Sequence, residues 1–341
     1  MAGMSRRGLL YGAAGATFTV AVGGSYLYNL HQHIPPRDAG AEERFRQAQA
    51  ALLASNGGRI RSRFVQLAAP RMRAQVLEGG EGEPVLMLHG GGAFAAQLDP
   101  LLSRLSVGFH VFAPDRPGCG LSDMISYLGV PLREHAVAYV ASVMDALGLR
   151  SANIVANSMG GYFGLVFALA HPERVTRLIT VGEPAGSSAD TGRAQGPLAI
   201  RGLNGLMYST VMKPSRKATY ESFRRILVAH PERVPEAMLD CCTASDQIPG
   251  SIESWLTLIE DATGPNGGQL TWGLRQELGK LTMPVLMIWG AKDYFDPPSL
   301  AYEMAEKMPH GRAVTIPDAG HLTWLDQLDP VESAIRSFVT A

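Results

Sequence analysis

The sequence predicts an α/β fold: a mostly parallel sheet covered by helices on both faces, with an inserted helical cap. Short continuous apolar runs, typical of buried parallel strands, alternate with helical patterns along most of the chain. One long stretch, residues 183–281, shows helical patterns and no strong strand signal. The chain has 341 residues, of which 46% are hydrophobic, so it is long enough to bury a large core around one such domain.

Residues 1–30 carry the features of an export signal or a membrane anchor. The run Ser5-Arg6-Arg7-Gly8-Leu9-Leu10 resembles a twin-arginine motif, and the uncharged segment 8–30 is long enough to span a bilayer as a helix. The positive-inside rule keeps the arginines cytoplasmic, so the rest of the chain is expected in the periplasm or outside the cell. Cleavage and anchoring both stay open, because Ala21-Val22-Gly23 is an imperfect cleavage site. An apolar helix packed on the protein or on a partner is the third alternative.

Residues 31–60 are predicted to form a tether between this segment and the folded domain. Residues 31–40 are polar and contain Pro35-Pro36, and residues 41–55 have the pattern of a short helix. Asn56-Gly57-Gly58 is expected to end that helix.

The α/β core is expected over residues 61–182 and 282–341. It opens with two alternating segments that favour antiparallel strands, 63–69 and 71–78. The predicted parallel strands are 85–88, 110–113, 153–156, 178–181, 285–289 and a weaker 313–316. The helices expected between and after them are 97–106, 132–147, 159–170, 300–307 and 330–339. In such sheets ligands bind beyond the carboxyl ends of the strands.

Residues 183–281 are predicted to form a mainly helical cap over those strand ends. Helical patterns occur at 220–229, 234–242 and 251–261. Several large side chains either line an apolar pocket or form the core of the cap, and the spacing leaves both readings open: Met207, Tyr208, Met212, Trp255 and Leu258.

Ser158 has the surroundings of a nucleophile. It follows the apolar run Ile154-Val155-Ala156-Asn157 and precedes Met159-Gly160-Gly161 and a long apolar helical pattern. This is the layout of a nucleophile elbow, a tight strand-to-helix turn that strains the serine at its tip. The turn needs small residues two places before and after the serine. Ala156 and Gly160 occupy those places, although the usual motif has glycine where Ala156 stands.

An acyl-transfer serine needs a base and a group that orients the base. His321 is the predicted base, because it follows the last strand in a loop that can reach Ser158. Asp293, directly after the strand 285–289, is the predicted orienting acid. Asp296 and Glu183 are its competitors.

Donors for an oxyanion are expected from two places. One is the backbone N–H of Met159, directly after the serine. The other is the loop His89-Gly90-Gly91-Gly92, where glycines let the backbone approach a substrate oxygen. Gly91 is the favoured donor, and Gly92 is expected next to the substrate.

The order Ser158, Asp293, His321 resembles the α/β-hydrolase family, and so does the run from Asp115 to Ser122, Asp-Arg-Pro-Gly-Cys-Gly-Leu-Ser. The resemblance covers roughly residues 63–341. It implies a Ser–His–Asp hydrolase of a small-molecule substrate, with a helical cap and with neither metal nor organic cofactor.

Within that family, Asn157-Ser158-Met159-Gly160-Gly161 is similar to the elbow of meta-cleavage-product hydrolases, which cut carbon–carbon bonds. The similarity implies that Asn157 lines the substrate site and that a basic cap residue, Arg224 or Arg225, meets a substrate carboxylate. Similar elbows also occur in esterases. Those carbon–carbon hydrolases usually have tryptophan after the catalytic histidine, where this chain has Leu322. Because the nucleophile is serine, the aspartate-dependent haloalkane dehalogenase and epoxide hydrolase activities are not expected.

Three hypotheses for function follow. The first is hydrolysis of a small or medium carboxylic ester through an acyl-enzyme on Ser158. The second is carbon–carbon bond hydrolysis, and the third is a non-catalytic ligand-binding module. A net charge of −1 without a basic stripe argues against nucleic acid as a partner. The three cysteines lack the spacing of a metal site or a disulfide framework.

Overall fold

The computed structural model describes residues 34–57, 59–187, 198–200, 202–210, 212–263 and 274–341, and over these residues the chain forms one eight-stranded sheet. The strand order is β1-β2-β4-β3-β5-β6-β7-β8. β1 (Arg61–Ala68) pairs antiparallel with β2 (Arg71–Gly79), which pairs antiparallel with β4 (Phe109–Pro114). The remaining pairs are parallel, between β3 (Glu83–Leu88), β4, β5 (Ala152–Asn157), β6 (Val175–Val181), β7 (Val285–Gly290) and β8 (Gly311–Ile316). The predicted fold class and all eight predicted strands are confirmed.

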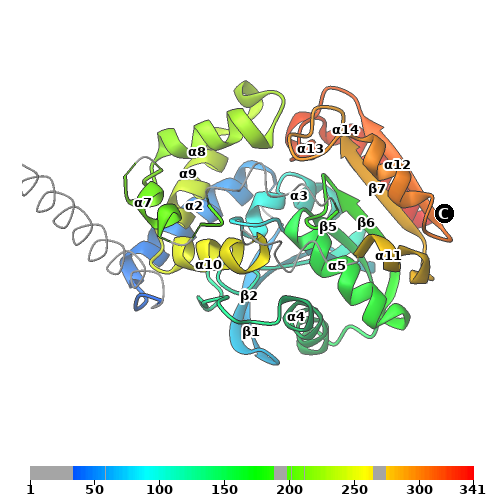
Figure 1. The fold of residues 1–341 in the computed structure, drawn as a ribbon, viewed down its shortest axis with the longest axis horizontal. Coiled ribbons are helices and arrows are strands. Elements are labelled where there is room, and N and C mark those ends of the chain that lie inside the picture. Colours follow the sequence, from blue (N-terminus) through cyan, green and yellow to red (C-terminus); the bar gives the residue numbers. More distant parts are fainter. Residues whose placement is uncertain (1–33, 58, 188–197, 201, 211, 264–273) are drawn as a thin grey trace, which may run out of the picture.

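Two hydrophobic cores cover the two faces of the sheet, because neighbouring residues of a strand point to opposite faces. In β3, Leu86 and Leu88 belong to one core, while Val85 and Met87 belong to the other. The first core also contains side chains of α4 (Leu132–Ala146), α5 (Met159–Ala170) and α12 (Ser299–Ala305). The second contains those of α3 (Leu101–Leu105), α13 (Thr323–Asp326) and α14 (Leu328–Thr340). The sheet is therefore the middle layer of three (Figure 1).

The helix predicted over residues 97–106 is two separate elements. A 3₁₀ turn, η1 (Ala95–Leu98), precedes α3, and Asp99-Pro100 lies between them. Proline lacks a backbone N–H and disfavours the helical conformation of the residue before it, which accounts for the break.

The described part of residues 183–281 is helical. It contains α7 (Leu203–Ser209), α8 (Arg216–Ser222), the π-helical η3 (Phe223–Leu227), η4 (Pro231–Arg233), α9 (Glu236–Asp246), α10 (Ser251–Thr263), α11 (Leu274–Glu277) and η6 (Leu278–Lys280). Figure 1 shows α7, α8, α9 and α10 gathered at one side of the molecule.

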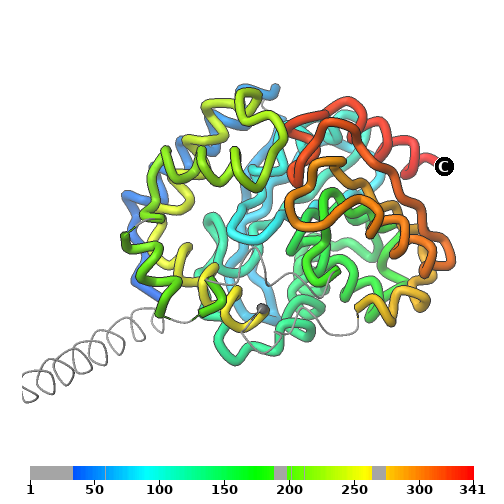
Figure 2. Tube along the Cα trace, turned by 45° about the horizontal axis from the view of Figure 1, so that its top comes forward, coloured from blue at the N-terminus to red at the C-terminus, as the bar shows by residue number. Residues whose placement is uncertain are grey.

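The structure confirms the helix predicted over residues 41–55 but corrects the tether predicted over residues 31–60. Most of it is the helix α2 (Ala39–Ser55), which packs against α9, as Figures 1 and 2 show. Phe45 and Leu52 are fully buried, and the ring of Phe45 meets Phe94 edge-on at 5.0 Å between centroids. Since these side chains belong to the second core, the segment is part of the folded body.

The predicted export or anchor segment lies outside the described residues. In the part of the chain that the structure describes, no helix combines the length and apolar character needed to cross a membrane.

Candidate active site

Ser158 lies at the tip of the turn between β5 and α5, with φ 51° and ψ −116°. Positive φ is unfavourable for a side chain with a Cβ, so the strain expected of a nucleophile elbow is present. A Cβ on Gly160 would lie 2.3 Å from the carbonyl oxygen of Leu88, so this position tolerates only glycine. A Cβ on Gly164 would lie 3.5 Å from the Ala156 methyl, an ordinary contact. The Ala156 methyl therefore has room against the facing helix α5.

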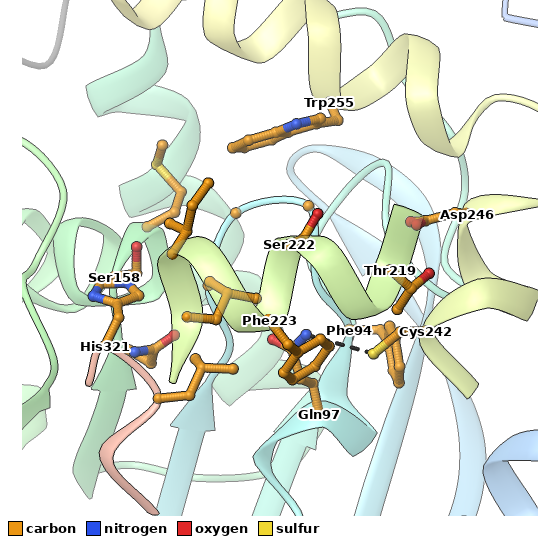
Figure 3. Close-up of a pocket in the computed structure, with 18 of the residues that line it drawn as sticks. Phe94, Gln97, Ser158, Thr219, Ser222, Phe223, Cys242, Asp246, Trp255 and His321 are labelled. Atoms are coloured by element: carbon orange, nitrogen blue, oxygen red, sulfur yellow. Dashed lines mark hydrogen bonds between the residues drawn. The ribbon is translucent and has the colours of Figure 1, made fainter. Parts of the chain in front are cut away.

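His321 and Asp293 form a hydrogen-bonded pair. His321 Nδ1 lies 3.1 Å and 3.0 Å from the two carboxylate oxygens of Asp293, and both side chains are almost completely buried. The backbone N–H groups of Glu183 and Phe295 also donate to this carboxylate, at 3.0 Å and 3.1 Å. Figure 3 shows the Ser158 side chain beside the imidazole of His321. The structure therefore brings the three predicted residues together at the carboxyl ends of the strands.

Neither competing acid replaces Asp293. The Asp296 backbone carbonyl accepts a hydrogen bond from the Trp289 indole at 2.9 Å, whereas the Asp293 carboxylate lies within hydrogen-bonding distance of His321 Nδ1. Glu183 is buried beside the pair. Burial, reinforced by the charges of Asp293 and Asp296, raises the pKa of Glu183 well above its ordinary value.

Arg116 fixes the glycine loop after β3. Its guanidinium donates to the carbonyls of His89 at 3.1 Å and Gly90 at 2.6 Å, and His89 Nδ1 lies 2.9 Å from the same Gly90 oxygen. In a trans peptide the N–H points away from the C=O. The Gly91 N–H therefore points away from Arg116 and His89. The Met159 N–H begins helix α5 and has no acceptor within the helix. The loop and Met159 both line the same cavity.

His89 is a contributor that sequence reasoning missed. Burial and the nearby Arg116 charge hold the pKa of His89 well below its usual value, so its ring is neutral. Its Nε2 accepts the Arg116 backbone N–H at 2.9 Å, which leaves the proton on Nδ1 for Gly90. The position of His89 at the start of a glycine loop pointed to a role in the site. The role could not be assigned from the sequence, because its partner Arg116 lies 27 residues away in the chain.

The loop that carries His321 is bound to the cap. Asp326 accepts backbone N–H bonds from Gly320 at 2.8 Å, Ala229 at 2.8 Å and His230 at 2.9 Å. The Leu322 N–H donates to the Leu227 carbonyl at 2.7 Å. These bonds fix the position of the His321 imidazole above the carboxyl ends of the strands.

A cavity of about 230 Å³ begins at Ser158 and extends under the cap. Asn157 and Gly92 line it, as predicted, but the Asn157 amide donates to the Val181 carbonyl at 2.6 Å and so joins β5 to β6. Trp255 forms the roof over the glycine loop, since a Cβ on Gly91 would lie 2.4 Å from its ring (Figure 3).

Of the cap residues that sequence analysis left open, Tyr208, Met212 and Trp255 line the cavity, while Leu258 is buried in the core. Met207 does not contribute to the lining. Sequence reasoning missed six polar lining residues: Gln97, Thr219, Ser222, Cys242, Asp246 and Ser251. They come from four separate helical elements and share no motif.

The expectation that Arg224 or Arg225 meets a substrate carboxylate is wrong for this structure. Both guanidinium groups are exposed, both pair with Glu221 on the same helical segment, and neither lines the cavity.

The model of a family described as alpha/beta hydrolase fold matches residues 83–327. The chain belongs to the α/β-hydrolase family. A 2-hydroxy-6-oxo-6-phenylhexa-2,4-dienoate hydrolase from Burkholderia cepacia is 27% identical to this hydrolase over 272 residues, which are 78% of this chain and 91% of the relative.

Solved structures share the fold of this hydrolase. Carboxylesterase CesB from Bacillus subtilis superposes with a TM-score of 0.70 at 20% identity, covering 88% of this chain and 99% of its own. A structure described as a membrane phospholipase A has a TM-score of 0.65 at 20% identity, covering 97% and 95%. Relatives and neighbours include carbon–carbon hydrolases and esterases. The protein is therefore a hydrolase, and the hypothesis of a non-catalytic binding module is not supported.

Proposed function

We propose that this hydrolase cleaves a carboxylic ester through an acyl-enzyme on Ser158. His321 Nε2 takes the hydroxyl proton while Oγ bonds to the ester carbonyl carbon, and Asp293 stabilises the resulting imidazolium. The Gly91 and Met159 N–H groups hold the oxyanion, an effect worth about 10²–10³ in rate per donor. The proton passes to the leaving alcohol as its C–O bond breaks. Water then attacks the acyl carbon, returns its proton through His321 to Ser158, and releases the acid.

The charge of the cavity lining favours an ester over a dienoate. The described lining residues include two carboxyl groups, Glu183 and Asp246, and no lysine or arginine. Burying a substrate carboxylate without a cationic partner is costly, and a facing carboxylate adds repulsion. This observation carries the proposal, because the esters concerned bring no carboxylate into the cavity.

Carbon–carbon bond hydrolysis is the second candidate. It is favoured by the 27% identity to a 2-hydroxy-6-oxo-6-phenylhexa-2,4-dienoate hydrolase over most of both chains and by the Asn157–Gly161 elbow. It requires the same nucleophile, so substrate preference distinguishes the two candidates.

The test compares p-nitrophenyl esters of two to twelve acyl carbons with 2-hydroxy-6-oxo-6-phenylhexa-2,4-dienoate. We expect kcat/KM for the best ester to exceed that for the dienoate by at least about 100-fold, the order expected when a buried charge has no partner. Ser158→Ala is the control that excludes background hydrolysis. Faster turnover of the dienoate would establish the second candidate instead.

We also propose that residues 8–30 direct export and hold the enzyme at the membrane. Ile34, the first described residue, contacts the turn before α10, since a Cβ on Gly250 would lie 3.0 Å from its side chain. Residues 31–33 span at most about 11 Å when extended. An anchor at residues 8–30 would therefore keep the cap, and with it the cavity, close to the bilayer.

A reporter fused after residue 30 tests this localisation. We expect it beyond the cytoplasmic membrane, and we expect Arg6→Lys with Arg7→Lys to retain it inside. A cytoplasmic reporter in the unmodified fusion would contradict the proposal. Carbonate extraction of the full-length protein then separates anchoring from cleavage.

A further inference from the structure

Asp246 is a carboxylate that the proposed reaction does not use. It ends helix α9 and lines the cavity, and Figure 3 shows it at the end opposite Ser158 and His321. No residue that the structure describes forms a hydrogen bond or an ion pair with this carboxylate. Burial alone raises its pKa to about 7. An unpaired charge in a cavity is costly to keep, which suggests that a ligand supplies the missing partner.

The hydroxyl groups near Asp246 present acceptors to the cavity. Thr243 donates its proton to the Leu239 carbonyl at 2.7 Å, so at the 3.0 Å contact between the two threonines Thr219 is the donor. Ser222 donates to the Ala218 carbonyl at 3.1 Å. The hydroxyls of Thr219 and Ser222 therefore donate their protons to the protein and keep lone pairs for a ligand.

The amide of Gln97 offers a further acceptor. Its nitrogen donates one of its two N–H groups to the Cys242 sulfur at 3.7 Å, and the amide oxygen can accept from a ligand. Tyr208 is the exception, because its hydroxyl accepts from the Trp255 indole and retains its proton. Phe94, Phe223 and Trp255 supply aromatic surface along the same cavity.

We propose that this end of the cavity is a subsite for a protonated amine, which Asp246 binds as its counter-ion, with Thr219, Ser222 and Gln97 as further acceptors. The subsite rests on the proposed function and defines its substrate class as esters that carry an ammonium group remote from the scissile bond. A lining of acceptors around one carboxylate matches a group that offers several donors and a positive charge. Aromatic faces also attract such a cation.

The experiment uses full-length enzyme at pH 8 and p-nitrophenyl esters of four to eight acyl carbons that end in an ammonium, a hydroxyl or a methyl group. A parallel set of acetate esters carries the same groups on the alcohol side. At the best length we expect kcat/KM for the ammonium ester to exceed that for the methyl ester by about tenfold or more, as for hydrogen bonds to charged groups.

Asp246→Asn is the test variant. We expect it to reverse the ratio, because the ammonium ester loses its counter-ion while the methyl ester no longer meets a buried charge. Asp240→Asn is the matched control, since Asp240 lies on the same helix but is exposed and paired with Arg216, so it should keep the wild-type ratio. Binding of hexylammonium, with hexanol as the neutral comparison, gives a readout that does not depend on turnover.

Three outcomes would overturn the subsite: equal turnover of all three end groups, preference for hydroxyl over ammonium, or a ratio unchanged in Asp246→Asn. Each of these leaves ester hydrolysis intact. Absence of turnover for every ester, together with no fluorophosphonate labelling of Ser158, would instead refute the proposed function itself.

Discussion

Replacement of Asp246 by asparagine should stabilise the protein in a manner that depends on pH. The pKa of this carboxyl is about 7 in the folded protein against 3.8 as the ordinary value, because the cavity wall desolvates it. Below about pH 4 both the folded and unfolded forms carry the proton, and the charge has no effect. Between pH 4 and 7 the unfolded chain releases the proton first, so the wild-type free energy of unfolding falls as pH rises. Above pH 7 the loss of unfolding free energy no longer changes with pH.

The size of the effect follows from the same values. At 1.36 kcal/mol for each pH unit, the wild type loses up to about 4 kcal/mol by pH 8. Asparagine carries no charge and avoids this loss. The difference between variant and wild type should therefore grow by about 1.4 kcal/mol per pH unit from pH 5 to 7 and then level off.

Urea unfolding followed by tryptophan fluorescence at several pH values from 5 to 8.5 measures this difference. Asp115, whose pKa is also raised to about 7 by burial, is present in both proteins and cancels. Asp240→Asn should show no such trend. A difference that stays flat across the pH range would refute the view that Asp246 is an unpaired buried charge, and with it the subsite. If Asp246→Asn gains stability and loses the preference for ammonium esters, Asp246 behaves as a binding residue whose charge costs stability in the free protein.

Two further comparisons test the triad and the elbow. Asp293→Asn should lower kcat by about 10⁴, because the imidazole loses its orienting carboxylate, whereas Asp296→Asn should change kcat by less than about threefold; equal losses would reassign the acid. Gly160→Ala should abolish turnover, since its Cβ would meet the Leu88 carbonyl at 2.3 Å. Ala156→Gly should leave kcat/KM within about twofold and lower the free energy of unfolding by about 1 kcal/mol. A Gly160→Ala variant with unchanged turnover would contradict the tight turn.

The fold was largely predictable because its signals are local. Alternating patterns marked β1 and β2, apolar runs of four or five residues marked the other six strands, and the order of strands and helices determined the class. The triad was predictable for the same reason: Ser158, Asp293 and His321 each follow a strand, and parallel strands end at one edge. The break at Pro100 was missed because the apolar pattern continues through it.

The cavity was not predictable, because its lining depends on how separate helices face one another. Nothing near Asp246 in the sequence distinguishes it from Asp240 six residues earlier, yet one faces the cavity and the other pairs with Arg216 on the surface. Likewise, the burial of Phe45 in α2 depends on contact with Phe94, 49 positions away. Tertiary packing decides such positions.

Fluorophosphonate labelling of the folded protein tests the central claim most directly. Mass analysis of the native wild type should find one adduct, on Ser158, and Ser158→Ala should carry none. Prior denaturation should abolish labelling, because the hydroxyl is activated by His321 and Asp293 only in the folded site. No adduct on the folded wild type, or an adduct that persists in Ser158→Ala, would contradict the account.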